Sequence, residues 1–464
     1  MNLIGTQSKK TFTRNSLVLA FQILIFLLPY FVLGVRGKDI PCIVSFAING
    51  ILFLIGIFFA QKKHAFSLSL IYWIFMFFFM YFAPLTQYLL SSFPWSGAVT
   101  DEECFLANLL ILLFNLCFAV GASLAKRLRV KGRTEKTDGG FFGSGFAFQK
   151  KGKIFVTVIV GLLTVYSFSR TGFLGIIVAR TQAIQVFYSG NNSAVQLLVD
   201  AIIPAFIAYA VAEAAQGMME KKERWIRFFI LSLCLLICFF PTTIPRYKTA
   251  AIYGTVFLLI FPRMKKGSNF YWAFVLAMFF AFPLLNSFRR VISLEGVESV
   301  FQNGFLSSYV KGDYDAYRML VSAIRYGRTT GFSWGYQLLG TLLFFVPRSL
   351  WPTKPSGSGS VLIQAEFGSS VFSNVSCPFI GEGYVNFGIP GVVLFAVLLG
   401  VFIRKVDERY WENAGEGRNI MFSPYLYLLF ILFFVLRGDL LSGFAYTCGF
   451  MVTGYALKKV SKYL

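Results

Sequence analysis

The chain has 464 residues, of which 56% are hydrophobic and only 14% are charged. A soluble domain carries roughly 25% charged residues, so this composition excludes an ordinary soluble enzyme and indicates a membrane protein. The net charge of +22 would suggest nucleic-acid binding in a soluble chain. In a membrane protein the same excess is expected of the lysines and arginines that set topology, and we therefore expect no nucleic-acid partner.

Twelve apolar stretches approach the roughly 20 residues that a helix needs to cross a bilayer. They lie at 15–35, 41–60, 66–90, 104–124, 154–169, 194–214, 227–244, 248–262, 270–287, 385–403, 421–436 and 440–457. Helices are expected because a spanning segment must satisfy its backbone hydrogen bonds internally. The predicted fold class is an all-α polytopic integral membrane protein with about 12 transmembrane helices and one large extracytoplasmic loop.

The predicted organisation has three parts. Residues 1–287 form the first nine transmembrane helices, with short loops and a basic cytoplasmic loop near 125–153. Residues 288–384 form the large extracytoplasmic loop, and residues 385–464 form the last three helices. With both termini in the cytoplasm, 28 of the 43 lysines and arginines fall on the cytoplasmic side, as the positive-inside rule requires.

The cations predicted to lie outside are mostly arginines, eleven against four lysines. A site that grips phosphate favours arginine because the guanidinium group bonds in a bidentate manner and keeps its charge when partly buried. Arg170, Arg246 and Arg437 lie directly at helix ends, where a lipid diphosphate would be placed. The alternatives are ordinary loop charge, arginines that reach toward lipid headgroups, or, for Arg437, a local pair with Asp439.

The large loop contains one apolar run, Leu338 to Val346, that is too short to cross a membrane comfortably. We interpret it as a re-entrant or surface-lying helix that ends at Pro347. The only histidine, His64, falls in a predicted cytoplasmic turn, so a histidine base is not expected outside. No Ser-His-Asp arrangement, zinc-ligand spacing or nucleotide-binding loop is present. We therefore expect neither a cofactor nor a metal.

Arginines and a few carboxylates are the chemically useful groups that remain in the outer segments. This set suits glycosyl transfer from a polyprenyl-diphosphate donor, because arginines stabilise the leaving diphosphate and a carboxylate activates the attacking hydroxyl. Glu382 is the first candidate for that carboxylate, ahead of Asp313 and Asp315, with Glu366 behind them. The alternatives are a carboxylate that interacts with a helix dipole for Glu382, and charge balance for the two aspartates.

Three motifs resemble those of the Wzy-type oligosaccharide repeat-unit polymerases, which build O-antigen and capsule in bacteria. They are the block from Val346 to Pro355 (VPRSLWPTKP), the block from Phe379 to Gly391 (FIGEGYVNFGIPG), and Leu436 to Asp439 (LRGD). Arg348 and Gly359 also have the spacing of an arginine, ten residues and a glycine found in some members. In the earlier outer loop, Arg180 and Gly190 are one residue short of it.

The resemblance implies a metal-independent polymerase that acts on undecaprenyl-diphosphate-linked glycans at the outer side of the bacterial cytoplasmic (inner) membrane. The predicted catalytic residues are Glu382, Arg348 and Asp313. The predicted substrate- and diphosphate-binding residues are Arg170, Arg246, Arg289, Arg290, Arg325, Lys354, Tyr384, Asn386 and Arg437. Membrane lipids are expected partners, and a chain-length regulator is a candidate protein partner.

Two other functions share part of this pattern. An O-antigen ligase uses the same donor, but it is typically associated with an outer-loop histidine, which this chain lacks. A lipid-linked oligosaccharide flippase would carry charged residues inside its spans, whereas the predicted spans here are almost free of charge.

Overall fold

The computed structural model describes residues 2–95, 98–131, 140–143, 145–171, 201–241, 244–282, 305–368, 375–414 and 422–463. These residues form helices and turns, without strands. Up to residue 282 the helices are α1 (Asn2–Leu33), α2 (Ile40–Lys63), α3 (Leu68–Phe77), the π-helix η1 (Phe78–Phe82), α4 (Ala83–Leu89), α5 (Asp101–Lys131), α6 (Gly140–Gly143), α7 (Lys150–Thr171), α11 (Ile203–Met219), α12 (Trp225–Cys238), α13 (Arg246–Ile260), the 3-10 helix η3 (Pro262–Lys265), α14 (Asn269–Leu276) and the π-helix η4 (Ala277–Ala281).

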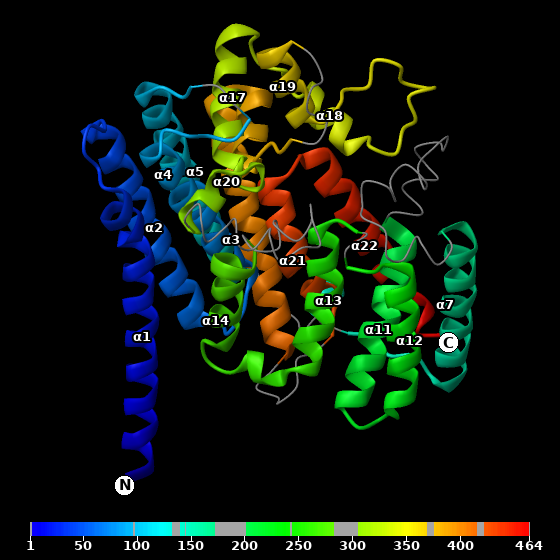
Figure 1. Ribbon diagram of the computed structural model, residues 1–464. Helices are drawn as coiled ribbons and strands as arrows, with labels where there is room; N and C mark the ends of the chain where they lie inside the picture. Colours follow the sequence, from blue (N-terminus) through cyan, green and yellow to red (C-terminus); the bar gives the residue numbers. More distant parts are fainter. Residues whose placement is uncertain are drawn as a thin grey trace.

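The remaining helices follow from residue 305. They are the 3-10 helices η5 (Phe305–Val310) and η6 (Gly312–Tyr314), then α17 (Ala316–Thr329), α18 (Tyr336–Leu342), α19 (Ser358–Phe367), α20 (Phe379–Ala414), α21 (Pro424–Arg437) and α22 (Leu440–Val460). Figure 1 shows α17, α18 and α19 gathered at one end of the bundle. The start of α1 and the connection between α11 and α12 lie at the opposite end.

A described helix overlaps each of the twelve predicted spans. Six helical stretches among the described residues are long and apolar enough to cross a membrane, which identifies the chain as an α-helical membrane protein. They are α2, the stretch Leu68–Leu89, Asp101–Arg127 of α5, Lys150–Ser169 of α7, α20 and α22. Shorter apolar helices, such as α12 and α21, stay predicted spans.

Close backbone contact between α5 and α20 forms the centre of the bundle. A Cβ atom at Gly400 would lie 2.2 Å from the carbonyl oxygen of Phe118, and one at Gly121 would lie 2.3 Å from that of Val397. Small residues allow helices in a membrane to approach in this way and so gain packing contacts. The stretch Leu68–Leu89 lies inside the bundle, with 94% of its most apolar window buried.

The motif at the start of α20 forms a kink. Gly388 has a φ of 65° and a ψ of −145°, so it separates a short first helical piece from the long helix that follows Pro390. A Cβ at Gly391 would lie 2.0 Å from the carbonyl oxygen of Gly383, because the two pieces touch at this point. Glycine is required at Gly388 for its conformation and at Gly391 for space.

The segment predicted as a large loop is largely helical where the structure describes it. The 14-residue helix α17, which the sequence analysis did not predict, buries nine residues and packs against α5, α19 and α20. The predicted short helix near Leu338 is present as α18, which ends at Leu342, before Pro347. This segment is therefore a packed cap on the bundle.

Candidate functional site

Polar residues from six helix ends and turns form two groups of bonded side chains at this cap. Arg246 begins α13, Asp313 and Asp315 precede α17, and Arg437 ends α21. We name the group the helix-mouth cluster; its members are Arg246, Asp313, Asp315, Ser358, Glu382, Arg437 and Asp439. Four of the residues predicted for the site, Arg246, Asp313, Glu382 and Arg437, belong to it.

Asp315 is the buried centre of one half of the cluster. It is 1% exposed, and its Oδ1 accepts hydrogen bonds from Arg437 Nη2 at 3.0 Å and from Ser376 Oγ at 2.7 Å. Its Oδ2 accepts from Trp95 Nε1 at 2.9 Å. Arg437 Nη2 also donates to the carbonyl oxygen of Gly312 at 3.1 Å. Arg437 is thus paired with Asp315 in the described contacts, which differs from the local pair with Asp439 considered above.

Arg246 and Asp313 form the more accessible half. Arg246 Nη1 lies 3.1 Å from Asp313 Oδ2, and the two side chains are 25% and 20% exposed. The Arg246 guanidinium also lies over the ring of Phe282, 5.4 Å from its centroid. The Arg437 side chain is 23% exposed, and its Nε is buried with no hydrogen-bond partner among the described residues. Both arginine side chains are thus partly accessible from outside the protein.

Glu382 lies deeper, where it connects three helices. It is 1% exposed; its Oε2 accepts from Ser358 Oγ at 2.7 Å, and its Oε1 accepts from the backbone N–H of Leu440 at 2.9 Å. The carboxylate thereby joins the first turns of α19, α20 and α22. Both oxygens are engaged, so the geometry supports a positioning role for Glu382 more directly than proton transfer with a substrate.

Asp439 completes the deeper layer as the N-cap of α22. Its Oδ1 accepts from the backbone N–H of Leu441 at 2.8 Å. Its Oδ2 lies against Gly357, where a Cβ atom would be only 1.5 Å away. Burial raises the pKa of Asp439 above its ordinary value.

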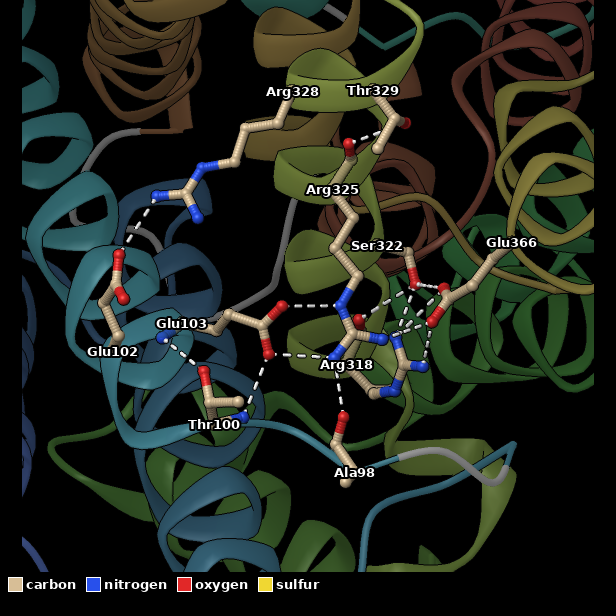
Figure 2. A network of polar contacts seen from close by, with 10 residues as sticks. All are labelled: Ala98, Thr100, Glu102, Glu103, Arg318, Ser322, Arg325, Arg328, Thr329 and Glu366. Atoms are coloured by element: carbon tan, nitrogen blue, oxygen red, sulfur yellow. Dashed lines mark hydrogen bonds and ion pairs between the residues drawn. The ribbon is translucent and has the colours of Figure 1, made fainter.

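Arg325 belongs to a different polar network, drawn in Figure 2. Its Nε lies 2.6 Å from Glu103 Oε1, its Nη1 contacts Glu366, and its Nη2 donates to the carbonyl oxygen of Ala98 at 2.6 Å. The same Glu366 carboxylate binds Arg318, which is 1% exposed, and Ser322 Oγ at 2.6 Å. These contacts join α17 to α5 and α19, so they hold the cap on the bundle.

Arg348 and Lys354 organise the turn that follows α18. Arg348 is exposed, and its Nη1 donates to the carbonyl oxygen of Lys354 at 2.7 Å. Lys354 Nζ donates to the carbonyl oxygens of Phe344 at 2.6 Å and Val346 at 2.9 Å. Burial, with a further contribution from the nearby Arg348 charge, lowers the pKa of Lys354. Neither side chain contacts the helix-mouth cluster in the described hydrogen bonds and ion pairs.

Tyr384 and Asn386 support the kinked start of α20. Asn386 is fully buried; its Oδ1 accepts from Ser333 Oγ at 3.1 Å and from the backbone N–H of Leu338 at 3.0 Å. The ring of Tyr384 packs edge-on against Phe332, with the centroids 5.6 Å apart. Both side chains position the turn before α18.

Three predicted site residues cannot be placed in this arrangement. Arg289 and Arg290 lie outside the described residues, and Arg170 lies in the last turn of α7 but its side chain is not described. In the described part of the chain, no three His, Cys, Asp or Glu side chains are grouped as metal ligands would be.

The sequence analysis missed some members of the cluster or gave them minor roles. Asp315 was weighed only as a secondary carboxylate, although four groups bind it, and Trp95 was not considered. The sequence does not mark Trp95 as a site residue, because its partner Asp315 is 220 residues away along the chain.

The comparisons with known proteins add no assignment: no protein-family model, no curated protein and no solved structure matches this chain.

Proposed function

We propose that this protein is a glycosyltransferase that polymerises undecaprenyl-diphosphate-linked oligosaccharide repeat units at the outer side of the bacterial cytoplasmic membrane. The observation that carries the proposal is the convergence of Arg246 and Arg437 with Asp313 at the ends of α13 and α21. Two part-exposed guanidinium groups suit a diphosphate, and a part-exposed carboxylate beside them suits an acceptor hydroxyl.

The reaction assigns a role to each of these groups. The acceptor hydroxyl oxygen attacks the anomeric carbon of the donor sugar, and its proton passes to the Asp313 carboxylate. The bond between the anomeric carbon and the diphosphate oxygen breaks, and undecaprenyl diphosphate leaves with the electron pair. Arg246 and Arg437 stabilise the negative charge that grows on the leaving group. Asp315 and Glu382 act through other residues, because both are buried and fully engaged.

The position of His64 favours the polymerase over the ligase. Its ring stacks on Trp411, with the centroids 4.8 Å apart and an angle of 6° between the planes. It follows α2 and lies beside the last turns of α20, whereas the helix-mouth cluster includes the first turn of α20. An outer histidine of the ligase type is thus absent from the described cluster.

Complementation tests the proposal. A strain of the source bacterium that lacks this protein should accumulate single repeat units, and wild-type protein should restore a glycan ladder on a gel. At equal protein levels, Asp313→Asn and Arg437→Gln should each reduce polymer by about 100-fold or more, the usual contribution of a general base and of electrostatic stabilisation of the leaving group, respectively. A ladder of normal intensity from Asp313→Asn would remove Asp313 from the mechanism.

Matched control variants lie at the contact between the cap and α5. Arg328 is 50% exposed and Glu102 is 80% exposed, and their nitrogen and oxygen atoms are 3.6 Å apart. Arg328→Gln and Glu102→Gln make the same charge changes outside the cluster, so both should keep a full ladder. If wild-type protein restores no ladder, or the deletion strain makes normal polymer, the polymerase assignment is wrong.

A further inference from the structure

A groove with a basic end and an apolar length lies between α7 and α12. It has a volume of about 450 Å³ and is lined at one end by four cations and one carboxylate: Lys150, Lys153, Arg224, Arg227 and Glu223. Its length is lined by Ile154, Val158, Ile226 and Ile230, all of them apolar. Figure 1 shows both helices on the side of the bundle away from α17.

Two of the cations at the groove, Arg227 and Lys153, are paired with the carboxylates of Glu213 and Glu223. Arg227 Nη1 pairs with Glu213 at 2.6 Å and with Glu223 at 3.1 Å, and Lys153 Nζ pairs with Glu223 at 2.9 Å. Arg227 Nη2, however, is buried without a hydrogen-bond partner among the described residues. A buried guanidinium N–H with no partner is costly and points to a group that binds there.

Lys150 and Arg224 leave a net positive charge at the same end. Both are exposed, and neither side chain forms an ion pair or hydrogen bond with the residues that the structure describes. They lie at the starts of two helices, α7 and α12, whose N-terminal dipoles also favour an anion. The basic end therefore fits a phosphate group.

The apolar side chains along the groove indicate which kind of phosphate-bearing molecule binds there. Ile154 is 60% exposed, Val158 55% and Ile226 47%, on helices that belong to a membrane protein. Side chains exposed in this way face lipid, so an acyl chain can lie along them while its headgroup reaches the cations. A free phosphate ion would use the basic end alone.

We propose that this groove binds an anionic phospholipid of the adjoining membrane leaflet. Its phosphate contacts Lys150 and Arg224 at the basic end, and one acyl chain lies between α7 and α12. The site is separate from the helix-mouth cluster and does not depend on the proposed polymerase function.

Native mass spectrometry of the full chain in detergent tests the proposal, with phosphatidylglycerol and phosphatidylcholine as probes. Phosphatidylglycerol should bind more tightly, and the double variant Lys150→Gln/Arg224→Gln should weaken its binding by roughly 30-fold, about five-fold for each cation. The control Lys221→Gln/Lys222→Gln changes two exposed charges at the same end that do not line the groove, and it should bind normally.

A second variant tests the apolar length separately. Val158→Trp should fill the groove and reduce phosphatidylglycerol binding while the basic end stays intact. Inorganic phosphate at millimolar concentration should not displace the lipid. Equal binding of the two lipids, equal losses in both double variants, unchanged binding in Val158→Trp, or displacement by phosphate would each overturn the proposal.

Discussion

Gly357 leaves space for the Asp439 carboxylate in the deeper layer of the helix-mouth cluster. A Cβ atom there would lie 1.5 Å from Asp439 Oδ2, and Asp439 is itself held as the N-cap of α22. We expect Gly357→Ala to displace that cap and to lower the free energy of unfolding by about 1–2 kcal/mol. Thermal unfolding of the detergent-solubilised protein measures the effect as a lower Tm.

Gly161 in α7 provides the control for this substitution. A Cβ at Gly161 would have no neighbour within 4 Å, so Gly161→Ala should gain up to about 1 kcal/mol from helix propensity. Equal Tm values for Gly357→Ala and Gly161→Ala would contradict the close packing of Gly357 against Asp439.

Stability and activity together separate the roles of Asp313 and Glu382. Glu382→Gln replaces an acceptor oxygen by an NH₂ group, so either Ser358 or the N–H of Leu440 loses its acceptor. We expect a loss of about 1–3 kcal/mol of stability together with reduced polymer formation. Asp313→Asn should reduce polymer by about 100-fold or more at a nearly unchanged Tm, since Asp313 is part-exposed. The roles would be reversed if Glu382→Gln lost activity at full stability and Asp313→Asn unfolded.

At the scale of an element, α17 shows what the sequence alone cannot reveal. Hydropathy identified the long apolar helices because a membrane requires about 20 apolar residues in succession. α17 has 14 residues, and its arginines made it resemble an ordinary loop. Arg325 contacts Glu103, 222 residues away, and Glu366, 41 residues away. Such pairs arise from tertiary packing and leave no pattern in the sequence. The sequence analysis predicted that Arg325 binds substrate, and the structure shows it in contacts that hold the cap in place.

Glu366 is the residue on which that network depends. Its substitution breaks the ion pair with Arg318, which is 1% exposed. Breaking a buried ion pair in this way costs about 3–5 kcal/mol. We expect Glu366→Gln to lower Tm strongly, measured by thermal unfolding at pH 7. Arg328→Gln, which breaks only an exposed contact, should change stability by less than about 1 kcal/mol. Similar Tm values for the two variants would contradict a structural role for the network.

The same carboxylate makes stability depend on pH. Burial raises the pKa of Glu366, but hydrogen bonds and charges from Arg318, Ser322 and Arg325 outweigh it, so the pKa lies below its ordinary value. A lowered folded-state pKa gives stability that is present above about pH 4.3, the unfolded value, and is lost as pH falls through the folded value. The Tm difference between wild type and Glu366→Gln should therefore be large at pH 7 and shrink below pH 4.3. A constant difference across that range would contradict the assignment.

At the scale of the whole molecule, the cap and the lipid groove lie at opposite ends of the bundle (Figure 1). Hydropathy predicted the six long apolar helices. It did not predict the contact between Arg246 and Asp313, because that contact depends on how α13 packs beside the segment before α17. The orientation in the membrane stays a prediction of the positive-inside rule. It requires the cap to face outward and the turn between α11 and α12 to face the cytoplasm.

Labelling of single introduced cysteines tests this orientation. All seven native cysteines are buried or half-buried, so the wild-type chain gives a low background with a membrane-impermeant maleimide. Ser349 follows α18 and Lys221 follows α11, and both are exposed. Ser349→Cys should react in cells with an intact cytoplasmic membrane, whereas Lys221→Cys should react only after that membrane is permeabilised. The opposite pattern would place the helix-mouth cluster in the cytoplasm, where lipid-linked repeat units are not polymerised in the proposed reaction. It would therefore exclude the proposed function while leaving the anionic-lipid groove intact in the other leaflet.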